Sequence, residues 1–246
     1  MLLIGALTSF LDAQQNRDDL TPIDIGYTVA VLADKATVHV DLDVQHLARP
    51  STRVAMPNWM PGAYGIGNFG AQVDELTATS GDRKLDVLQI DPLTWSIDTA
   101  GVQTMRVSYS VKQRPGRFGP RASGDEKTGM QVSGPGTYLY VVGAKERPVT
   151  VRYQLPDGWK YANGLLPTND PLVRRARDYD TFIDAPTQFG VFQSHEFDVN
   201  GTPFQCVFFE NGQRYDFDVP AFVAFVKRIV TYQGEMFGSF PFPNYV

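Results

Sequence analysis

Three histidines are the residues through which this chain could most readily bind a metal, and their spacing argues against a shared site. A helical zinc hydrolase needs His-Glu-x-x-His, which places two imidazoles one turn apart with a glutamate base between them. No such run occurs in the 246 residues. His39 and His46 lie on one predicted strand at an odd separation, which predicts opposite faces. His195-Glu196 is followed by no second histidine. We therefore predict no metal ligand and no catalytic residue in this chain.

Motifs for other chemistries are missing or misplaced. There is no Gly-x-Ser-x-Gly elbow, and Ser123-Gly124-Asp125 has no candidate base nearby in sequence. The run Gly65–Gly70 matches Gly-x-Gly-x-x-Gly, but it precedes a strand-like segment instead of opening a helix, so we reject a nucleotide site. Cys206 is the only cysteine, which excludes an intramolecular disulfide and favours a small apolar filler.

The amino-acid composition limits the classes of partner that the chain can bind. The chain is 43% hydrophobic and 20% charged, as in soluble globular proteins, and its net charge of −5 argues against nucleic acid, which needs a basic face. No stretch approaches the roughly 18 apolar residues of a membrane span. Composition alone does not identify the class of ligand.

The first 20 residues differ from the rest. Leu2–Leu11 is an apolar run of signal-peptide length, and Ala13 is a small residue after which cleavage could follow. The positive n-region is missing, as it would be if translation started further upstream. We interpret residues 1–20 as a clipped signal segment with a polar lead-in, and expect an exported protein, periplasmic or secreted. The alternative is a short buried strand or helix.

Alternating apolar and polar residues predict a mostly β, antiparallel domain of sandwich or saddle-like form over residues 21–213. The stretch Gln113–Thr137 has no periodicity and is predicted to be a long loop. The predicted strands are Ile23–Leu32, Ala36–Leu47, Ser51–Met56, Gln72–Thr79, Lys84–Ile90, Thr94–Asp98, Gln103–Lys112, Tyr138–Gly143, Val149–Leu155, Val191–Val199 and Thr202–Glu210.

The period changes in residues 214–246, where apolar residues recur at three- and four-residue steps and predict one amphipathic helix. Asp218 is a suitable N-cap, Pro220 fits the first turn, and Gly238 can end the helix. The apolar face is wide, with Phe225 extending a stripe of Phe222, Val223, Val226, Ile229 and Val230. A face this wide must be buried, on the β-domain or on a further domain; if left uncovered, Val219–Phe240 is expected to fray or to drive self-association.

One loop combines two prolines, a glycine and two large aromatic residues: Met56-Pro57-Asn58-Trp59-Met60-Pro61-Gly62-Ala63-Tyr64. It predicts a stiff turn that presents Trp59 and Tyr64 at a sheet edge. This is more often a packed corner than a binding site.

The same run resembles the Met-Pro-x-Trp-x-Pro-Gly-x-Tyr signature of the N-terminal domain of the glycyl aminopeptidases, metallopeptidase family 61, a group of PDZ-containing zinc peptidases. Any one motif is weak, but four in order are hard to obtain by chance. The other three are Leu155-Pro156-Asp157-Gly158-Trp159-Lys160-Tyr161-Ala162, Asp178–Pro186 with Gly190, and Phe237-Gly238-Ser239-Phe240-Pro241-Phe242-Pro243-Asn244-Tyr245. The resemblance as a whole covers about residues 23–246.

The resemblance implies a β-rich accessory domain followed by the entry helix of a catalytic domain. It implies zinc in a full-length relative, but no cofactor in this chain, because the sequence ends before a zinc-binding helix. Many relatives have Tyr-x-Ile-Arg-Asp after the Pro-Gly, whereas this chain has Tyr64-Gly65-Ile66-Gly67-Asn68. The role of that Arg and Asp is therefore in doubt here. We take Trp59, Tyr64 and Asn68 as the candidate substrate-binding residues.

Two functions remain open. The first is a non-catalytic accessory domain of an exported zinc aminopeptidase, which helps shape the peptide-binding cleft and has the missing catalytic domain or a peptide substrate as its partner. The second is a free-standing β-sandwich module that holds a peptide or glycan with the Trp59–Tyr64 loop and with Arg114, Arg117 and Arg121.

Overall fold

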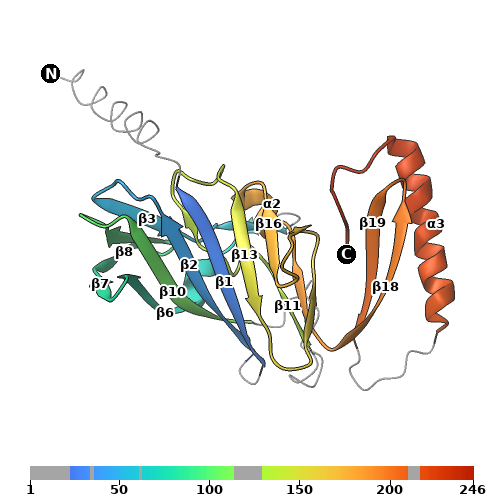
Figure 1. The fold of residues 1–246 in the computed structure, drawn as a ribbon, viewed down its shortest axis with the longest axis horizontal. Helices are drawn as coiled ribbons and strands as arrows, with labels where there is room; N and C mark the ends of the chain where they lie inside the picture. Colours follow the sequence, from blue (N-terminus) through green and yellow to red (C-terminus); the bar gives the residue numbers. More distant parts are fainter. Residues whose placement is uncertain (1–22, 34–35, 61–62, 114–128, 210–216) are drawn as a thin grey trace.

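A computed structural model describes residues 23–33, 36–60, 63–113, 129–209 and 217–246. Its largest element is an eight-stranded sheet in which all neighbouring strands are antiparallel except β1 and β13, which run parallel (Figure 1). The order across the sheet is β15 (Leu166–Pro167), β16 (Val173–Ala176), β13 (Val149–Gln154), β1 (Asp24–Leu32), β2 (Thr37–Gln45), β10 (Thr104–Lys112), β6 (Val73–Ser80) and β7 (Arg83–Leu85).

The strict alternation in β1, β2 and β10 explains this sheet. Every second residue of β2, including Val40 and Leu42, is completely buried, while the residues between them stay partly exposed. Since side chains of a strand alternate between faces, this pattern puts one face on the core and one toward solvent. The predicted mostly β fold is confirmed.

Two smaller sheets contribute to the same core. One has the order β12 (Tyr140–Val141), β3 (Ser51–Ala55), β9 (Thr94–Asp98) and β8 (Val87–Asp91), and the other has β11 (Gly129–Val132), β17 (Thr187–Gly190) and β14 (Lys160–Ala162). Val54, Ile97 and Phe189 from these sheets are completely buried in one cluster with the large sheet. We call the three sheets together the β-body.

Short elements join the strands of the β-body. A two-stranded hairpin pairs β4 (Trp59–Met60) with β5 (Ala63–Ile66), and a 3-10 helix, η2, follows at Phe69–Gln72. A single turn of helix, α2 (Tyr179–Ile183), follows β16. Within the run Gly65–Gly70, close packing requires glycine at Gly70, because a Cβ at this position would lie 2.0 Å from the Pro92 carbonyl oxygen. A Cβ at Gly65 would meet nothing within 4 Å.

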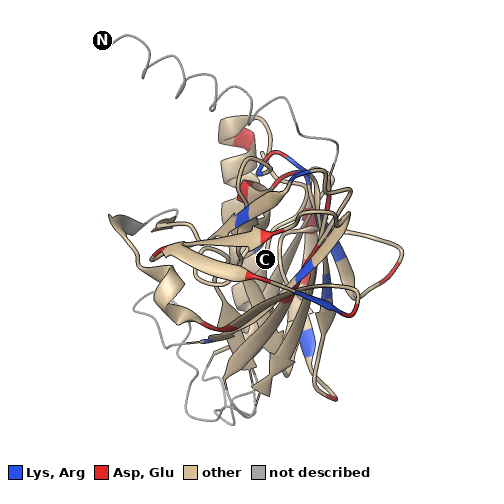
Figure 2. Cartoon of the chain, turned by 90° about the vertical axis from the view of Figure 1, so that its left-hand side faces the viewer, with Lys and Arg blue, Asp and Glu red and all other residues tan. Residues whose placement is uncertain are grey.

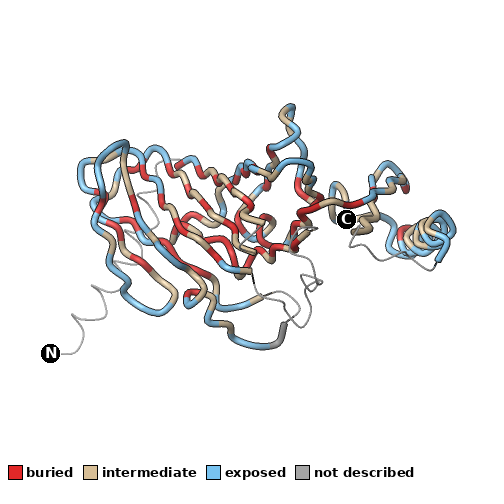
Figure 3. The backbone as a smooth tube through the Cα atoms, turned by 90° about the horizontal axis from the view of Figure 1, so that it is seen from below, coloured by how far each residue is buried: buried red, intermediate tan, exposed pale blue. Residues whose placement is uncertain are grey.

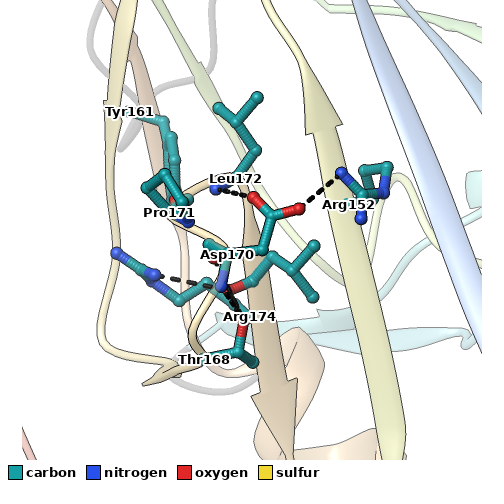
Figure 4. A network of polar contacts seen from close by, with 8 residues as sticks. Arg152, Tyr161, Thr168, Asp170, Pro171, Leu172 and Arg174 are labelled. Carbon is teal, nitrogen blue, oxygen red and sulfur yellow. Dashed lines mark hydrogen bonds and ion pairs between the residues drawn. The ribbon is translucent and has the colours of Figure 1, made fainter.

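A hydrogen-bonded loop fixes the edge of the large sheet between β15 and β16 (Figure 4). The Asp170 carboxylate accepts a bond from the Leu172 N–H at 2.9 Å and pairs with the Arg152 guanidinium, also at 2.9 Å. These bonds lower the pKa of Asp170. The Tyr161 hydroxyl donates to the Pro171 carbonyl, and the Arg174 guanidinium lies over the Tyr161 ring at 5.0 Å. The motif around Trp159 is thereby held by packing contacts.

A second, smaller part follows the β-body and is here called the hairpin–helix unit. It consists of β18 (Phe192–Val199), β19 (Thr202–Phe209), α3 (Val219–Phe237) and residues 238–246, and it lies at one end of the molecule (Figures 1 and 3). Asp218 caps α3 by accepting the Ala221 N–H, Pro220 lies in its first turn, and Gly238 ends it in the left-handed conformation. The predicted helix and its caps are confirmed.

Tyr245 continues the hairpin as a short third strand. Its N–H donates to the Pro203 carbonyl and its carbonyl accepts from the Gln205 N–H, in a parallel bridge with Phe204. The chain at Tyr245 therefore pairs with β19. Asn244 ties this end to the β-body through a 3.2 Å bond from its amide to the Leu165 carbonyl.

Three local predictions are wrong. The predicted loop Gln113–Thr137 contains strand β11, where Gly129 lets the Phe209 ring and the Phe189 carbonyl approach within the space of a Cβ. His46 lies outside β2, which ends at Gln45, and has a positive φ of 61°. The predicted strand Lys84–Ile90 is in fact two strands, β7 and β8, which belong to different sheets.

Candidate functional site

A half-open cavity of about 780 Å³ lies on the β-body. Four segments far apart in sequence form it: the start of the proline-rich loop, the turn after β8, strand β12 with the turn that follows it, and helix α2 with the residues around it. The lining includes Met56, Pro57, Asn58, Trp59, Asp91, Thr94, Tyr140, Lys145, Arg177, Asp178, Asp180 and Asp184. Two of the four family-like motifs, around Trp59 and around Asp178, therefore meet at one place.

Backbone hydrogen bonds anchor the proline-rich loop beneath the cavity. Met56 is buried and its N–H donates to the Leu93 carbonyl at 2.9 Å, while the Asn58 carbonyl accepts from Gly67 N–H at 2.7 Å. Pro57 restricts the backbone between these anchors. Trp59 follows them with 57% of its surface exposed, so the anchored loop holds a large aromatic side chain in solvent.

Helix α2 supplies the opposite wall. Its N-cap is Asp178, whose carboxylate accepts the Thr181 N–H at 2.6 Å and pairs with the Arg177 Nε at 3.1 Å. Burial alone would raise the pKa of Asp178, but the hydrogen bonds from Thr181 and the charge of Arg177 outweigh it and lower the pKa. Tyr179 and Phe182 are buried and fix the helix to the core, which leaves Asp180 and Asp184 exposed at the cavity.

Buried tyrosines position the strand that contributes Tyr140. The hydroxyls of Tyr27, Tyr109 and Tyr179 donate to the carbonyls of Leu139, Thr137 and Tyr138, respectively, at 2.6, 3.0 and 2.5 Å. Burial raises the pKa of all three phenols, so they stay protonated and able to donate. The three bonds fix the backbone just before Tyr140, a cavity residue.

A cation–aromatic–carboxylate contact already lies in the cavity wall. The Lys145 ammonium is 4.4 Å from the Tyr140 ring centroid, 5.4 Å from that of Tyr179 and 3.7 Å from the Asp180 carboxylate. The pKa of Tyr140 is raised by burial first and then by the nearby Asp91 and Asp180 charges. The cavity is therefore a negatively charged environment.

The structure places the predicted site residues in different ways. Trp59 lines the cavity. Asn68 is exposed, caps η2 without a side-chain hydrogen bond, and is not among the cavity-lining residues. The backbone of Tyr64 lies in β5, but its side chain is outside what the structure describes. Arg114, Arg117 and Arg121 also lie outside the described residues. Sequence reasoning missed Asp91 and Lys145, which belong to no motif, and gave no site role to Asp184, although it lies in the Asp178–Pro186 motif.

The histidines occupy separate surroundings. His39 contacts Ser110 and Asp41, His46 contacts Asp24, and the His195 ring lies edge-on to Phe208. Among the described residues, no group of three or more His, Cys, Asp or Glu is arranged to hold a metal ion. The described side chains therefore do not fit a zinc centre, and no zinc-dependent step can be assigned to them.

A serine, a histidine and an aspartate do meet on the polar face of the large sheet. Ser110 Oγ is 3.2 Å from His39 Nδ1, and His39 Nε2 is 3.5 Å from Asp41 Oδ1. Register explains the contact, because His39 lies opposite Ser110 and Asp41 lies opposite Ser108. One pair further along, Arg106 bonds Asp43 at 2.8 and 3.0 Å. These are cross-strand pairs of a polar row, which stabilise a sheet by small amounts each.

Charges elsewhere are mixed. Blue and red residues are scattered over the strands seen in Figure 2, with no single-sign face in that view. None of the described helices is long and apolar enough to cross a membrane.

These observations define a mostly β domain with one anchored, acidic cavity. The sequence profile of the Peptidase M61 N-terminal domain matches residues 26–191, about two thirds of the chain. The chain therefore belongs to this family, which confirms the resemblance drawn from the four motifs. The motif Phe237–Tyr245 lies beyond the matched range.

A solved structure shows the same fold. An aminopeptidase N family protein from Idiomarina loihiensis matches with a TM-score of 0.79 and 24% identity, over 90% of this chain and 38% of that one. This chain thus spans well under half of that protein. Yeast LTA4 hydrolase matches at a TM-score of 0.41 and 10% identity, over 79% of this chain and 35% of its own. No curated protein sequence matches the chain.

Proposed function

We propose that the chain acts as a non-catalytic accessory domain of a zinc aminopeptidase-like peptidase, docks on the catalytic domain through α3, and contributes its cavity to peptide binding. The observation that carries the proposal is a second apolar stripe on α3. Val219, Val223, Val226, Val230 and Gly234 are half-buried or buried. A separate stripe at three- and four-residue steps is exposed: Phe222, Phe225, Ile229, Tyr232 and Met236.

This outer stripe is too large to be incidental. Its five members are 42–68% exposed, although burying each large apolar side chain would stabilise the protein by about 1.5–3 kcal/mol. Contiguous exposed apolar residues at helical spacing are typical of a helix that another helix covers. The family to which the chain belongs and the longer neighbour from Idiomarina loihiensis both support a peptidase catalytic domain as the cover.

Co-expression with the catalytic portion of a full-length family member tests docking. We expect the 246-residue chain to co-purify with it, and the Phe225→Ser/Ile229→Ser variant to lose at least ten-fold in captured amount. Leu88→Ser/Ile90→Ser is the matched control, because these side chains are 66% and 48% exposed on β8, outside the hairpin–helix unit. Equal capture of both variants would overturn the docking proposal, as would concentration-dependent dimers that the α3 variant abolishes with no capture of the catalytic portion.

Activity is expected only in the complex. The purified chain should not hydrolyse aminoacyl substrates or hold stoichiometric zinc, because His39, His46 and His195 have separate partners. Metal analysis that found a tightly held zinc ion, lost on His195→Ala, would contradict this.

Export is part of the same proposal. The apolar run Leu2–Leu11 supports it, and these residues lie outside the described part of the chain. Fractionation of cells that express the gene from its own upstream region should find the chain outside the cytoplasm; a wholly cytoplasmic product would refute export.

A further inference from the structure

The cavity walls contain more acidic groups than basic ones. Four aspartates line it, Asp91, Asp178, Asp180 and Asp184, against two cations, Lys145 and Arg177. With all carboxylates ionised the lining carries a formal charge of −2, from four negative and two positive groups. The volume of about 780 Å³ is in the range of cavities that hold small ligands.

Both cations already have partners in the wall. Lys145 pairs with Asp180 and lies over Tyr140, while Arg177 donates to Asp178 and to the Thr181 hydroxyl at 3.0 Å. Among the described residues, neither Asp91 nor Asp184 forms an ion pair. Asp91 accepts the Leu93 N–H at 2.8 Å, and hydrogen bonds from Leu93 and Thr94 lower its pKa, so the group is ionised at neutral pH. Within the described part of the chain, neither Asp91 nor Asp184 is therefore neutralised by a cation.

Trp59 adds an aromatic surface to the same cavity. Tryptophan is the best aromatic partner for a cation, and the Lys145–Tyr140 contact shows that this cavity already uses such an interaction. A guanidinium group satisfies both features at once, because it stacks on rings and donates paired hydrogen bonds to carboxylates. A ligand without charge would leave Asp91 and Asp184 unpaired.

We propose that this cavity binds a cationic side chain of a peptide, arginine above all, with Trp59 stacking on the guanidinium and Asp91 and Asp184 pairing with it. The inference deepens the proposed function and rests on its assignment of the cavity to peptide. It names the substrate class: peptides with a basic residue.

Calorimetric titration of the 246-residue chain with capped peptides tests the inference. We expect acetyl-Gly-Arg-Gly-amide to bind at least ten-fold more tightly than acetyl-Gly-Leu-Gly-amide, and acetyl-Gly-Glu-Gly-amide not to bind measurably. Asp184→Asn and Trp59→Ala should each weaken the arginine peptide about ten-fold. Raising the ionic strength from 0.05 to 0.5 M should weaken it further, because exposed charge pairs are screened.

The matched control is Asp82→Asn, which removes an equal charge from an exposed turn that does not line the cavity. Unchanged arginine binding in this variant separates the cavity from the net charge of the protein. Thermal unfolding followed by circular dichroism shows whether each variant folds. If Trp59→Ala does not fold, the arginine affinity of Asp184→Asn alone decides the test.

Three results would overturn the inference: equal affinity for the arginine and leucine peptides, no binding of any peptide, or binding of a neutral oligosaccharide that Trp59→Ala abolishes. None of them bears on docking, which is measured separately with α3 variants. Loss of docking with retained arginine selectivity would refute the accessory role and leave the cavity assignment standing.

Discussion

The β-body and the hairpin–helix unit differ in how completely each buries its apolar residues. In the β-body, Val29, Val38 and Leu42 on neighbouring strands have no exposed surface. In α3, Gly234 is the only described residue that is buried, while Phe225 and Met236 are at least half exposed. The β-body therefore has a closed hydrophobic core, whereas α3 is covered mainly on one face.

The difference has a physical consequence for stability. A helix of 19 residues is marginal without tertiary packing, and α3 packs mainly through its valine stripe, where Phe240 fits against Gly234. Of the exposed stripe, Phe222 contacts the hairpin, with its ring centroid 6.0 Å from that of Phe208. The β-body should therefore determine the global free energy of unfolding, while α3 opens locally at lower cost.

Hydrogen exchange provides the largest expected contrast. Amides of β1, β2 and β10 should exchange only through global unfolding, which costs about 5–15 kcal/mol in ordinary domains. Amides of Val219–Phe237 should exchange at least a hundred-fold faster, because the exposed stripe adds no stability. Equal protection of α3 and β2 in a verified monomer would mean that the helix is fully stabilised by its own hairpin, and the docking proposal would lose its main support.

Alanine substitution sharpens the same contrast. Leu42→Ala removes a completely buried side chain from the centre of the large sheet and should lower the free energy of unfolding by about 2–5 kcal/mol. Ile229→Ala removes a side chain that is 42% exposed and should change it by less than about 0.5 kcal/mol. Urea denaturation followed by circular dichroism measures both. A loss of about 2 kcal/mol at Ile229 would show that α3 belongs to the global core.

Sequence reasoning found the elements whose pattern is long enough to repeat. Nine-residue strands such as β1, β2 and β10 alternate four times or more, and α3 has its caps in the local sequence. It missed β14, β15, β16 and β17, which have two to four residues each. Such segments are too short to show a period, and their pairing partners come from elsewhere in the chain, as with β17 between β11 and β14.

Prediction of the cavity from the sequence was limited in the same way, to residues with a local signal. The proline-rich composition around Trp59 indicated one wall, since turn residues and exposed aromatic residues leave a local signal. Asp91 and Lys145 leave no such signal, because each is an ordinary surface residue that only the tertiary fold brings to the cavity, and the motif that contains Asp184 gave no indication that it faces Trp59 across a cavity. The sequence also could not predict which side of α3 is covered, because both stripes are apolar. Only the burial in the structure distinguishes the half-buried valine stripe from the exposed aromatic stripe.

The N-caps of α2 and α3 give the smallest expected difference in stability between the β-body and the hairpin–helix unit, and the most specific test of it. Asp178 accepts the Thr181 N–H at 2.6 Å in α2, and Asp218 accepts the Ala221 N–H at 3.0 Å in α3. Loss of an aspartate N-cap costs about 1 kcal/mol. Because α2 is fixed to the core by Tyr179 and Phe182, Asp178→Ala should lower the global free energy of unfolding by that amount. Asp218→Ala should leave the global value within about 0.3 kcal/mol, and should only speed exchange in the first turns of α3.

The acid dependence of the Asp178→Ala effect tests whether the ionised Asp178 carboxylate is the source of the stabilisation. The pKa of Asp178 is lowered from its ordinary value of 3.8 in the folded state, so its stabilisation is present above about pH 4 and disappears as the pH falls through the lowered pKa. The difference between the wild type and Asp178→Ala should therefore be constant from pH 5 to 7 and shrink below pH 4. Urea midpoints measured at pH 3, 5 and 7 decide it. If the difference persisted undiminished at pH 3, packing of the Asp178 side chain would be its source, because a protonated carboxyl can no longer pair with Arg177 or accept the Thr181 N–H as an anion.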